Sequence, residues 1–450
     1  MKKAAVGALL VLFTLVVVQV WLTPQGSTPA WRAHFDREIL TAPCRLGDHI
    51  AVLGDRREIA LLDRQGQVVA RQALPRPPRH PLVALPSAVV VADREAGLRA
   101  YRGEALTLLW ERATLQTSPL PPQALPGDRL LVPTDARTLI AVEGRSGDPL
   151  WDIQLPNPVQ HTAVGRVALA CTYGQDDGPG ATFRLQVYDL EAGEPLWSFS
   201  GPVAIFPPIP TQDLFLFVTS QGSVVGAEQE TGALRLRLDS PGLHHVFAEG
   251  DTIGIVASDG RQVIGASLSG RRPWTARLGA TFLAAKVVGD LVMLADRSGL
   301  QCLDVSTGEV VWRRDLGPIL TAHPHRRGMA VLYKSSFLDR HGSFAYLPAA
   351  SGEPAWVCVE NAMFHPPLPD GRLDLVFCRN GAIYGMPVPK SEEPTPAVPT
   401  AAEPAFPPLP RPATPTFDLP GPGTGFPPRA LPPGSLPDRL PDQEPASGWD

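Results

Sequence analysis

Short hydrophobic runs alternate with turn residues along most of the chain, and this pattern predicts β-strands. In residues 290–317, DLVMLADRSGLQCLDVSTGEVVWRRDLG, the apolar run Leu291–Ala295 is followed by a turn and a second apolar run. A further turn at Ser306–Gly308 precedes a third strand, which carries Trp312. Apolar runs bounded by Gly, Asp and Ser are typical of antiparallel hairpins. The stretch therefore predicts a β-meander.

A glycine followed four residues later by tryptophan recurs along the chain. The motifs SGDPLW, AGEPLW, SGRRPW, TGEVVW and SGEPAW contain Gly147 and Trp151, Gly193 and Trp197, Gly270 and Trp274, Gly308 and Trp312, and Gly352 and Trp356. Degenerate copies keep the frame with Gly66 and Ala70, with Leu106 and Trp110, and with Gly232 and Leu236. Successive tryptophan positions, from 70 to 356, are 38 to 46 residues apart. This regular spacing indicates an internal repeat.

Each period predicts a four-stranded antiparallel sheet. An apolar strand such as LFLFVTS follows the tryptophan position, then a turn, then a second strand such as LIAVEG. Such sheets bury both faces only when they stack radially into a propeller. Eight units end in a tryptophan-position strand, and a ninth, PDGRLDLVFCRNGAIYGMPVP, has inner strands only; the segment around Trp31 can supply its outer strand and close the ring. We expect an all-β propeller of about eight four-stranded blades over residues 31–389.

The repeated glycines and tryptophans have a structural explanation. Glycine supplies positive φ at the turn before the outer strand. Tryptophan buries about 150–250 Å² of surface, which suits a ring wedged between neighbouring sheets. We therefore expect blade-docking roles for Trp110, Trp151, Trp197, Trp274, Trp312 and Trp356, with Gly147, Gly193, Gly270, Gly308 and Gly352.

The repeat VMLADRSGLQCLDVSTGEVVW resembles that of the quinoprotein-type (PQQ-like) β-propeller family. That family includes pyrroloquinoline-quinone dehydrogenases and the propeller subunit of the outer-membrane assembly machinery. The resemblance to the dehydrogenases implies a vicinal cysteine pair and a calcium site, but no such pair exists here. The chain has only separated cysteines: Cys44, Cys171, Cys302, Cys358 and Cys378. We expect no cofactor and a closer likeness to the assembly subunit; a Cys358–Cys378 disulfide is an open alternative to buried thiols.

The N-terminus predicts a membrane segment. Two lysines precede about 19 mostly apolar residues, Ala4 to Leu22, which at about 1.5 Å per residue just span a bilayer core of about 30 Å. The lysines keep the N-terminus in the cytoplasm. We therefore expect residues 1–23 to anchor a single-pass protein in the cytoplasmic membrane, N-in, with the propeller outside. A cleaved signal peptide with a secreted or periplasmic propeller is the alternative.

Composition adds two points. Of the 51 prolines, many fall in residues 390–450, which predicts a disordered, polyproline-like tail. The sequence PPLPRP at Pro407–Pro412 is similar to ligands of proline-binding domains, although a spacer is the alternative. The net charge of −5 argues against a nucleic-acid partner.

No catalytic motif stands out, because the chain has no phosphate loop, GxSxG elbow or HExxH helix. Asp176 and Asp177, in the insertion GQDDGPGAT, can bind a cation or form a solvated turn. We assign no catalytic, cofactor or metal residue. The first hypothesis is a non-enzymatic scaffold that binds an envelope protein or polymer. The alternatives are a quinone-dependent dehydrogenase and another extracytoplasmic enzyme on the same propeller.

Histidines follow the tryptophan positions at a similar distance. Seven of the ten lie 8 to 13 residues later: His80, His161, His244, His245, His323, His325 and His365. The offset places them where the chain enters the next inner strand, so we expect them at one mouth of the channel. There they can line a wet channel, bind a metal, or recognise a ligand in a pH-dependent way.

Overall fold

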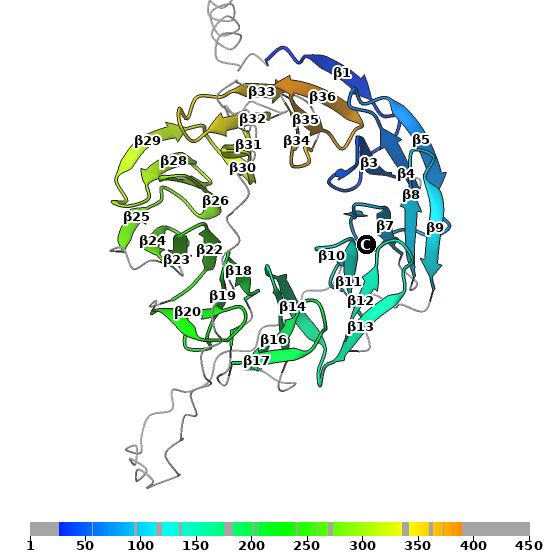
Figure 1. Cartoon of the computed structure of the whole chain (residues 1–450). Coiled ribbons are helices and arrows are strands. Elements are labelled where there is room, and N and C mark those ends of the chain that lie inside the picture. The colour runs from blue at the N-terminus through cyan, green and yellow to red at the C-terminus, as the bar shows by residue number, and fades with distance from the viewer. Residues whose placement is uncertain are drawn as a thin grey trace, which may run out of the picture. The chain divides into compact units, whose positions relative to one another are not determined.

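All regular structure described in the computed structural model is β (Figure 1). The structure describes residues 27–55, 57–93, 97–113, 119–134, 137–174, 183–199, 201, 203–204, 206–239, 242–257, 259–268, 273–334, 342–359, 363–371 and 373–388. Within these ranges, 36 strands form nine four-stranded antiparallel sheets. None of the same residues forms a helix that could cross a membrane. The expected anchor at residues 1–23 and the tail from 390 lie outside the described residues.

Eight sheets, or blades, are continuous in sequence. Blade 1 contains β2 (Cys44–Leu46), β3 (His49–Gly54), β4 (Glu58–Leu62) and β5 (Val68–Ala73), and blade 2 contains β6 (Val83–Ala84), β7 (Val89–Ala92), β8 (Leu98–Arg102) and β9 (Thr107–Arg112). Blade 3 contains β10 (Gln123–Leu125), β11 (Arg129–Pro133), β12 (Thr138–Glu143) and β13 (Pro149–Gln154), and blade 4 contains β14 (Val159–Val164), β15 (Ala168–Gly174), β16 (Phe183–Asp189) and β17 (Pro195–Ser198). Blade 5 contains β18 (Ile209–Pro210), β19 (Leu214–Val218), β20 (Val224–Glu228) and β21 (Leu234–Leu238), and blade 6 contains β22 (His245–Glu249), β23 (Thr252–Val256), β24 (Gln262–Ser267) and β25 (Trp274–Arg277). Blade 7 contains β26 (Phe282–Val288), β27 (Leu291–Asp296), β28 (Gly299–Asp304) and β29 (Val310–Asp315), and blade 8 contains β30 (Ile319–His325), β31 (Gly328–Tyr333), β32 (Ser343–Pro348) and β33 (Trp356–Val359).

Blade 9 joins the two ends of the described chain. It contains β34 (Leu368–Asp370), β35 (Leu373–Phe377) and β36 (Ala382–Pro387), and its outer strand is β1 (Trp31–His34). Trp31 lies opposite Gly385, and His34 lies opposite Ala382. The prediction that the Trp31 segment completes the last unit is confirmed, but the expected count of about eight blades is wrong. Eight is the number of units that carry their own outer strand, and the N-terminal strand makes the ninth blade complete.

Burial follows the position of each strand in its blade. The second and third strands, such as β3 and β4, are almost entirely buried because neighbouring blades cover both of their faces. The innermost strands, such as β14, are partly exposed toward the axis of the ring. Along outer strands such as β5, exposed residues alternate with partly buried ones. The core therefore consists of separate clusters between neighbouring blades, as where Met293 and Leu300 of blade 7 pack with Met329 and Val331 of blade 8.

The strand count fixes the direction of the chain in every blade. Four antiparallel strands return the chain to the end at which it entered, so all innermost strands run in the same direction. One face of the ring, the crossover face, carries the connections between blades and the turns between second and third strands. The opposite face carries the other two turns of each blade. In Figure 1 the blades follow one another around the ring, with strands such as β14, β26 and β30 nearest the centre.

Candidate functional site

Outer-strand tryptophans pack on glycines of the following blade. We call each boundary between two blades a seam. At the blade 2–3 seam the Trp110 ring lies 2.6 Å from where a Cβ on Gly147 would be, and φ of Gly147 is +71°. The same arrangement joins Trp31 to Gly66, Trp151 to Gly193, Trp197 to Gly232, Trp274 to Gly308, and Trp312 to Gly352. Glycine is therefore required both for the positive φ and for the space that the ring fills.

Four of these rings also make the same hydrogen bond. The indole Nε1 of Trp312 donates to the Ala349 carbonyl at 2.7 Å. Trp110, Trp197 and Trp274 donate to Gly144, Gln229 and Val305 at 2.8, 2.9 and 2.7 Å. Each acceptor lies three residues before the contacted glycine. One turn of the next blade therefore provides both the glycine on which the ring packs and the carbonyl that accepts from the indole N–H. Each sequence motif contains a glycine and a tryptophan in one hexapeptide, but these two residues do not pack on each other. The tryptophan of one motif packs on the glycine of the next motif along the chain.

Two seams depart from this pairing. At the blade 1–2 seam Ala70 stands at the tryptophan position, and Leu106 stands at the glycine position with φ of +50°. Leu106 is fully buried in a cluster that Ala70 contacts, so its side chain occupies the space of the missing ring. At the blade 5–6 seam Leu236 replaces tryptophan and packs in one cluster with Leu268. Gly270, the expected partner there, lies outside the described residues.

The blade 8–9 seam contains a buried charge. The Trp356 Nε1 donates to Asp374 Oδ2 at 2.8 Å, and the His325 and Arg326 side chains lie 2.8 and 2.5 Å from Asp374 Oδ1. Burial acts to raise the pKa of Asp374, but the contacts with His325, Arg326 and Trp356 outweigh it and lower the pKa below its ordinary value. Trp356 and His325 thus join blade 8 to blade 9.

The seven histidines do not gather at one mouth. His245 is the first residue of β22 and His325 is the last of β30, so they lie at opposite ends of strands that run in the same direction. His161 and His323 lie within β14 and β30, and His80, His244 and His365 precede inner strands. Burial lowers the pKa of His245, His323 and His365, which favours neutral rings at pH 7. Among the described residues, no group of three His, Cys, Asp or Glu side chains can hold a metal ion.

The five cysteines are buried or partly buried thiols. No disulfide joins the five cysteines, and Cys358 and Cys378 belong to the same buried cluster. Burial raises the pKa of the Cys44 and Cys302 thiols to about 12, so both are protonated at neutral pH and poor nucleophiles. Asp176 and Asp177 lie outside the described residues.

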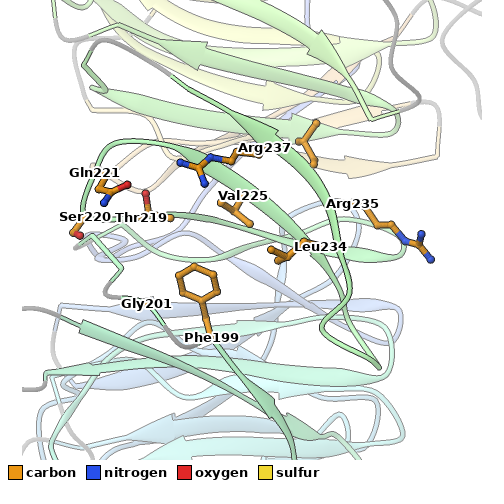
Figure 2. Close-up of a pocket in the computed structure, with 10 residues that line it drawn as sticks. Phe199, Gly201, Thr219, Ser220, Gln221, Val225, Leu234, Arg235 and Arg237 are labelled. Atoms are coloured by element: carbon orange, nitrogen blue, oxygen red, sulfur yellow. The ribbon is translucent and has the colours of Figure 1, made fainter. Parts of the chain in front are cut away.

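A cavity of about 370 Å³ opens between blades 4 and 5. Phe199, just after β17, faces Val225 and Leu234 of blade 5, while Arg235 points away (Figure 2). The Leu234 side chain is unusually exposed, at 62%, and Arg235 forms an ion pair with Glu228 at 2.6 Å. An apolar cleft with a polar rim suits an apolar side chain of a polypeptide. Sequence reasoning missed this cavity, although the LRLRL strand, with leucine at the tryptophan position, marks its blade.

Fold and seams together define a β-propeller of PQQ-like repeats. The chain belongs to the family whose model is described as "Outer membrane protein assembly factor BamB", which matches residues 20–170, 107–203 and 181–373. The resemblance inferred from the repeat is therefore confirmed. No curated protein matches the chain.

Several solved structures align with the chain at low sequence identity. A eukaryotic initiation factor structure aligns with a TM-score of 0.57 and 13% identity, covering 74% of this chain and 90% of that one. BamB from Moraxella catarrhalis aligns at 0.48 and 15%, covering 68% and 94%. The dihydro-heme d1 dehydrogenase NirN aligns at 0.49 and 14%, covering 75% and 80%. At these identities the likeness concerns the fold alone.

Proposed function

We propose that the protein is a non-enzymatic scaffold that binds another protein of the cell envelope during assembly. The observation that carries this proposal is the family match, which extends over most of the propeller and is described by an assembly factor. The seams support it, because the repeated tryptophans and glycines are used to hold blades together.

The proposed contact surface is the cavity between blades 4 and 5. It combines the partly buried Phe199 and the exposed Leu234 with arginines whose charges are already paired to Glu228 and Asp239. Such a surface accepts an apolar anchor residue of a partner without burying an unpaired charge.

Photo-crosslinking in living cells tests this contact. A photoreactive amino acid at position 234 should give a discrete adduct with an envelope protein. Position 108 is the matched control, because Leu108 is 52% exposed on the outer strand β9 and lines no part of this cavity. Adducts of equal yield at both positions, or none at position 234, would contradict the proposed surface.

We further propose that residues 1–23 anchor the ring in the cytoplasmic membrane, N-in, with the propeller outside. The Ser27 backbone N–H donates to the Val357 carbonyl at 2.7 Å, so the first described residue lies at the outer strand of blade 8. Reporter fusions at Asp450 should be active outside the cytoplasm, and fusions active only inside it would contradict this topology. The alternative, a quinone-dependent enzyme, predicts dye-linked alcohol oxidation by the purified chain after addition of pyrroloquinoline quinone.

A further inference from the structure

Four exposed arginines surround the crossover between blades 6 and 7. Arg261 lies in the turn before β24, and Arg277 ends β25. Arg297 lies in the turn after β27, and Arg313 lies on β29. We call these four residues the arginine cluster. Their positions come from four separate segments, so no sequence motif announces them.

Backbone contacts place the four segments together on the crossover face. The Leu278 N–H donates to the Arg261 carbonyl at 2.7 Å, and the Arg297 N–H donates to the Thr281 carbonyl at 3.1 Å. The Arg313 Nη2 lies 2.8 Å from where a Cβ on Gly279 would be. The crossover at 278–281 therefore has one pair of arginines on each side, and Gly279 leaves room for the Arg313 guanidinium.

None of the four guanidinium groups forms a hydrogen bond or ion pair with a described residue. Other arginines of the same face are paired: Arg71 binds Asp36 and Glu58, and Arg99 binds Asp93 and Glu111. The contrast indicates that the charges of the arginine cluster are not used to hold the ring together.

The nearby carboxylates are already committed to the backbone. Asp296 accepts from the N–H groups of Gly279, Ala280, Ser298 and Gly299 and from the Ser298 hydroxyl. Asp259 accepts from the N–H groups of Arg261 and Gln262 at 2.8 and 3.1 Å. The charges of Arg261 and Arg277 help the backbone N–H groups to lower the pKa of Asp259, but neither guanidinium forms an ion pair or hydrogen bond with it. The turns fix the loops that carry the arginines, and the guanidinium donors stay available for an external anion.

We propose that the arginine cluster binds a ligand that carries a phosphate group with two negative charges. Arginine presents a planar fork of donors that fits phosphate in a bidentate way, and all four positions are arginine rather than lysine. A phosphate monoester offers three oxygens and two charges to donors that approach from both sides of the crossover. A single carboxylate offers two oxygens in one plane and one charge. This site lies in blades 6 and 7, apart from the cavity between blades 4 and 5, so it can fail without affecting the proposed partner contact.

Calorimetric titration of the full chain in a neutral detergent tests the proposal. The probes are inorganic pyrophosphate and short-chain phosphatidic acid, with short-chain phosphatidylcholine as the neutral lipid. Binding of pyrophosphate alone assigns a soluble ligand, and binding of phosphatidic acid alone or more tightly assigns a lipid headgroup. Binding of neither probe, or equal binding of phosphatidylcholine or of polyglutamate, would overturn the proposal.

Matched variants separate the site from general charge. The quadruple variant Arg261→Gln, Arg277→Gln, Arg297→Gln, Arg313→Gln should bind at least about tenfold more weakly. The control Arg64→Gln, Arg145→Gln, Arg166→Gln, Arg327→Gln removes four exposed arginines from the opposite face and should bind as the unmodified chain does. Replacement of the cluster by four lysines keeps the charge but loses the forks, and its affinity should lie between the two. Equal loss in cluster and control variants would overturn the assignment.

Discussion

At the scale of single residues, the ring is held by contacts that require a flat aromatic ring on one blade and no Cβ on the next. Trp312 shows the arrangement fully: its ring lies 2.6 Å from where a Cβ on Gly352 would be, and its Nε1 bonds to the Ala349 carbonyl. Such a contact stabilises the fold because it buries apolar area and because the buried indole N–H has an acceptor. Loss of either partner should therefore weaken a seam rather than change binding.

Trp312→Ala should destabilise the protein by about 3–5 kcal/mol, as large-to-small core substitutions do. Gly352→Ala should also destabilise it, because the added methyl overlaps the ring and φ of Gly352 is +64°. Chemical denaturation of the folded chain measures both effects. An unchanged unfolding free energy for either variant would show that the ring is not a seam contact.

The Ala70–Leu106 seam predicts a compensating pair. Ala70→Trp alone should cost about 1–3 kcal/mol, because Leu106 already fills the space. Adding Leu106→Gly should recover much of that loss, because glycine makes room and tolerates the φ of +50°. A double-mutant cycle measures the coupling. If the changes in unfolding free energy of the two substitutions simply add, the side chains at positions 70 and 106 do not compete for the same space at the seam.

At the scale of elements, blade 9 is the place where the chain closes on itself. Its outer strand β1 comes from the N-terminus, and its contact with blade 8 passes through the buried Asp374 rather than a tryptophan–glycine pair. On the other side, Trp31 lies on Gly66 of blade 1. Closing the sheet in this way leaves neither terminal strand of the ring as an unpaired edge.

A cysteine pair tests the closure. Arg32 and Tyr384 are direct partners in β1 and β36, so Arg32→Cys with Tyr384→Cys should form a disulfide under oxidising conditions. Because the bond closes a very long loop, the oxidised pair should be about 6 kcal/mol more stable than the same variant with the pair reduced, in the chain-entropy model. Non-reducing electrophoresis and thermal melting are the readouts. Failure of the pair to oxidise would argue against the pairing of β1 with β36.

Asp374 predicts a dependence on pH at the same blade. Asp374→Asn should destabilise the protein by about 3–5 kcal/mol at pH 7, because it leaves buried His325 and Arg326 without their anion. The pKa of Asp374 is lower in the folded chain, so its stabilisation is complete above the unfolded pKa of about 3.9 and is lost as pH falls through the folded value. The difference in melting temperature between the two proteins should therefore narrow below about pH 4. A difference that stays constant down to pH 2 would show that the carboxylate charge is not involved.

The sequence predicted the blade plan because each motif obeys a local rule, a positive-φ glycine before a strand that carries a large apolar ring. The blade count of about eight was wrong because only eight units carry their own tryptophan-position strand; the ninth unit, whose outer strand the Trp31 segment was expected to supply, was not counted as a separate blade. The histidines follow the tryptophan positions by 8 to 13 residues, so their offsets differ by up to five residues. Five residues of strand cover about 16 Å, which is the length of an inner strand, so a similar offset does not place the histidines at the same end of it. The cavity at Leu234 and the arginine cluster combine separate segments, which only the fold brings together.

At the scale of the whole molecule, the ring carries two surfaces of different chemistry. The cavity between blades 4 and 5 is apolar, and its arginines form ion pairs. The arginine cluster on blades 6 and 7 is cationic, and its guanidinium groups form no ion pair with a described residue. The net charge of −5 conceals this difference. Two separate surfaces are what the proposed scaffold role requires.

Depletion of the protein from the cells that make it tests the assembly role most directly. Quantitative electrophoresis of the outer-membrane fraction should show less folded β-barrel protein after depletion. Expression of the whole chain should restore the amount, and expression of the chain without residues 1–23 should not. An unchanged amount of folded outer-membrane protein in depleted cells would contradict the assembly role.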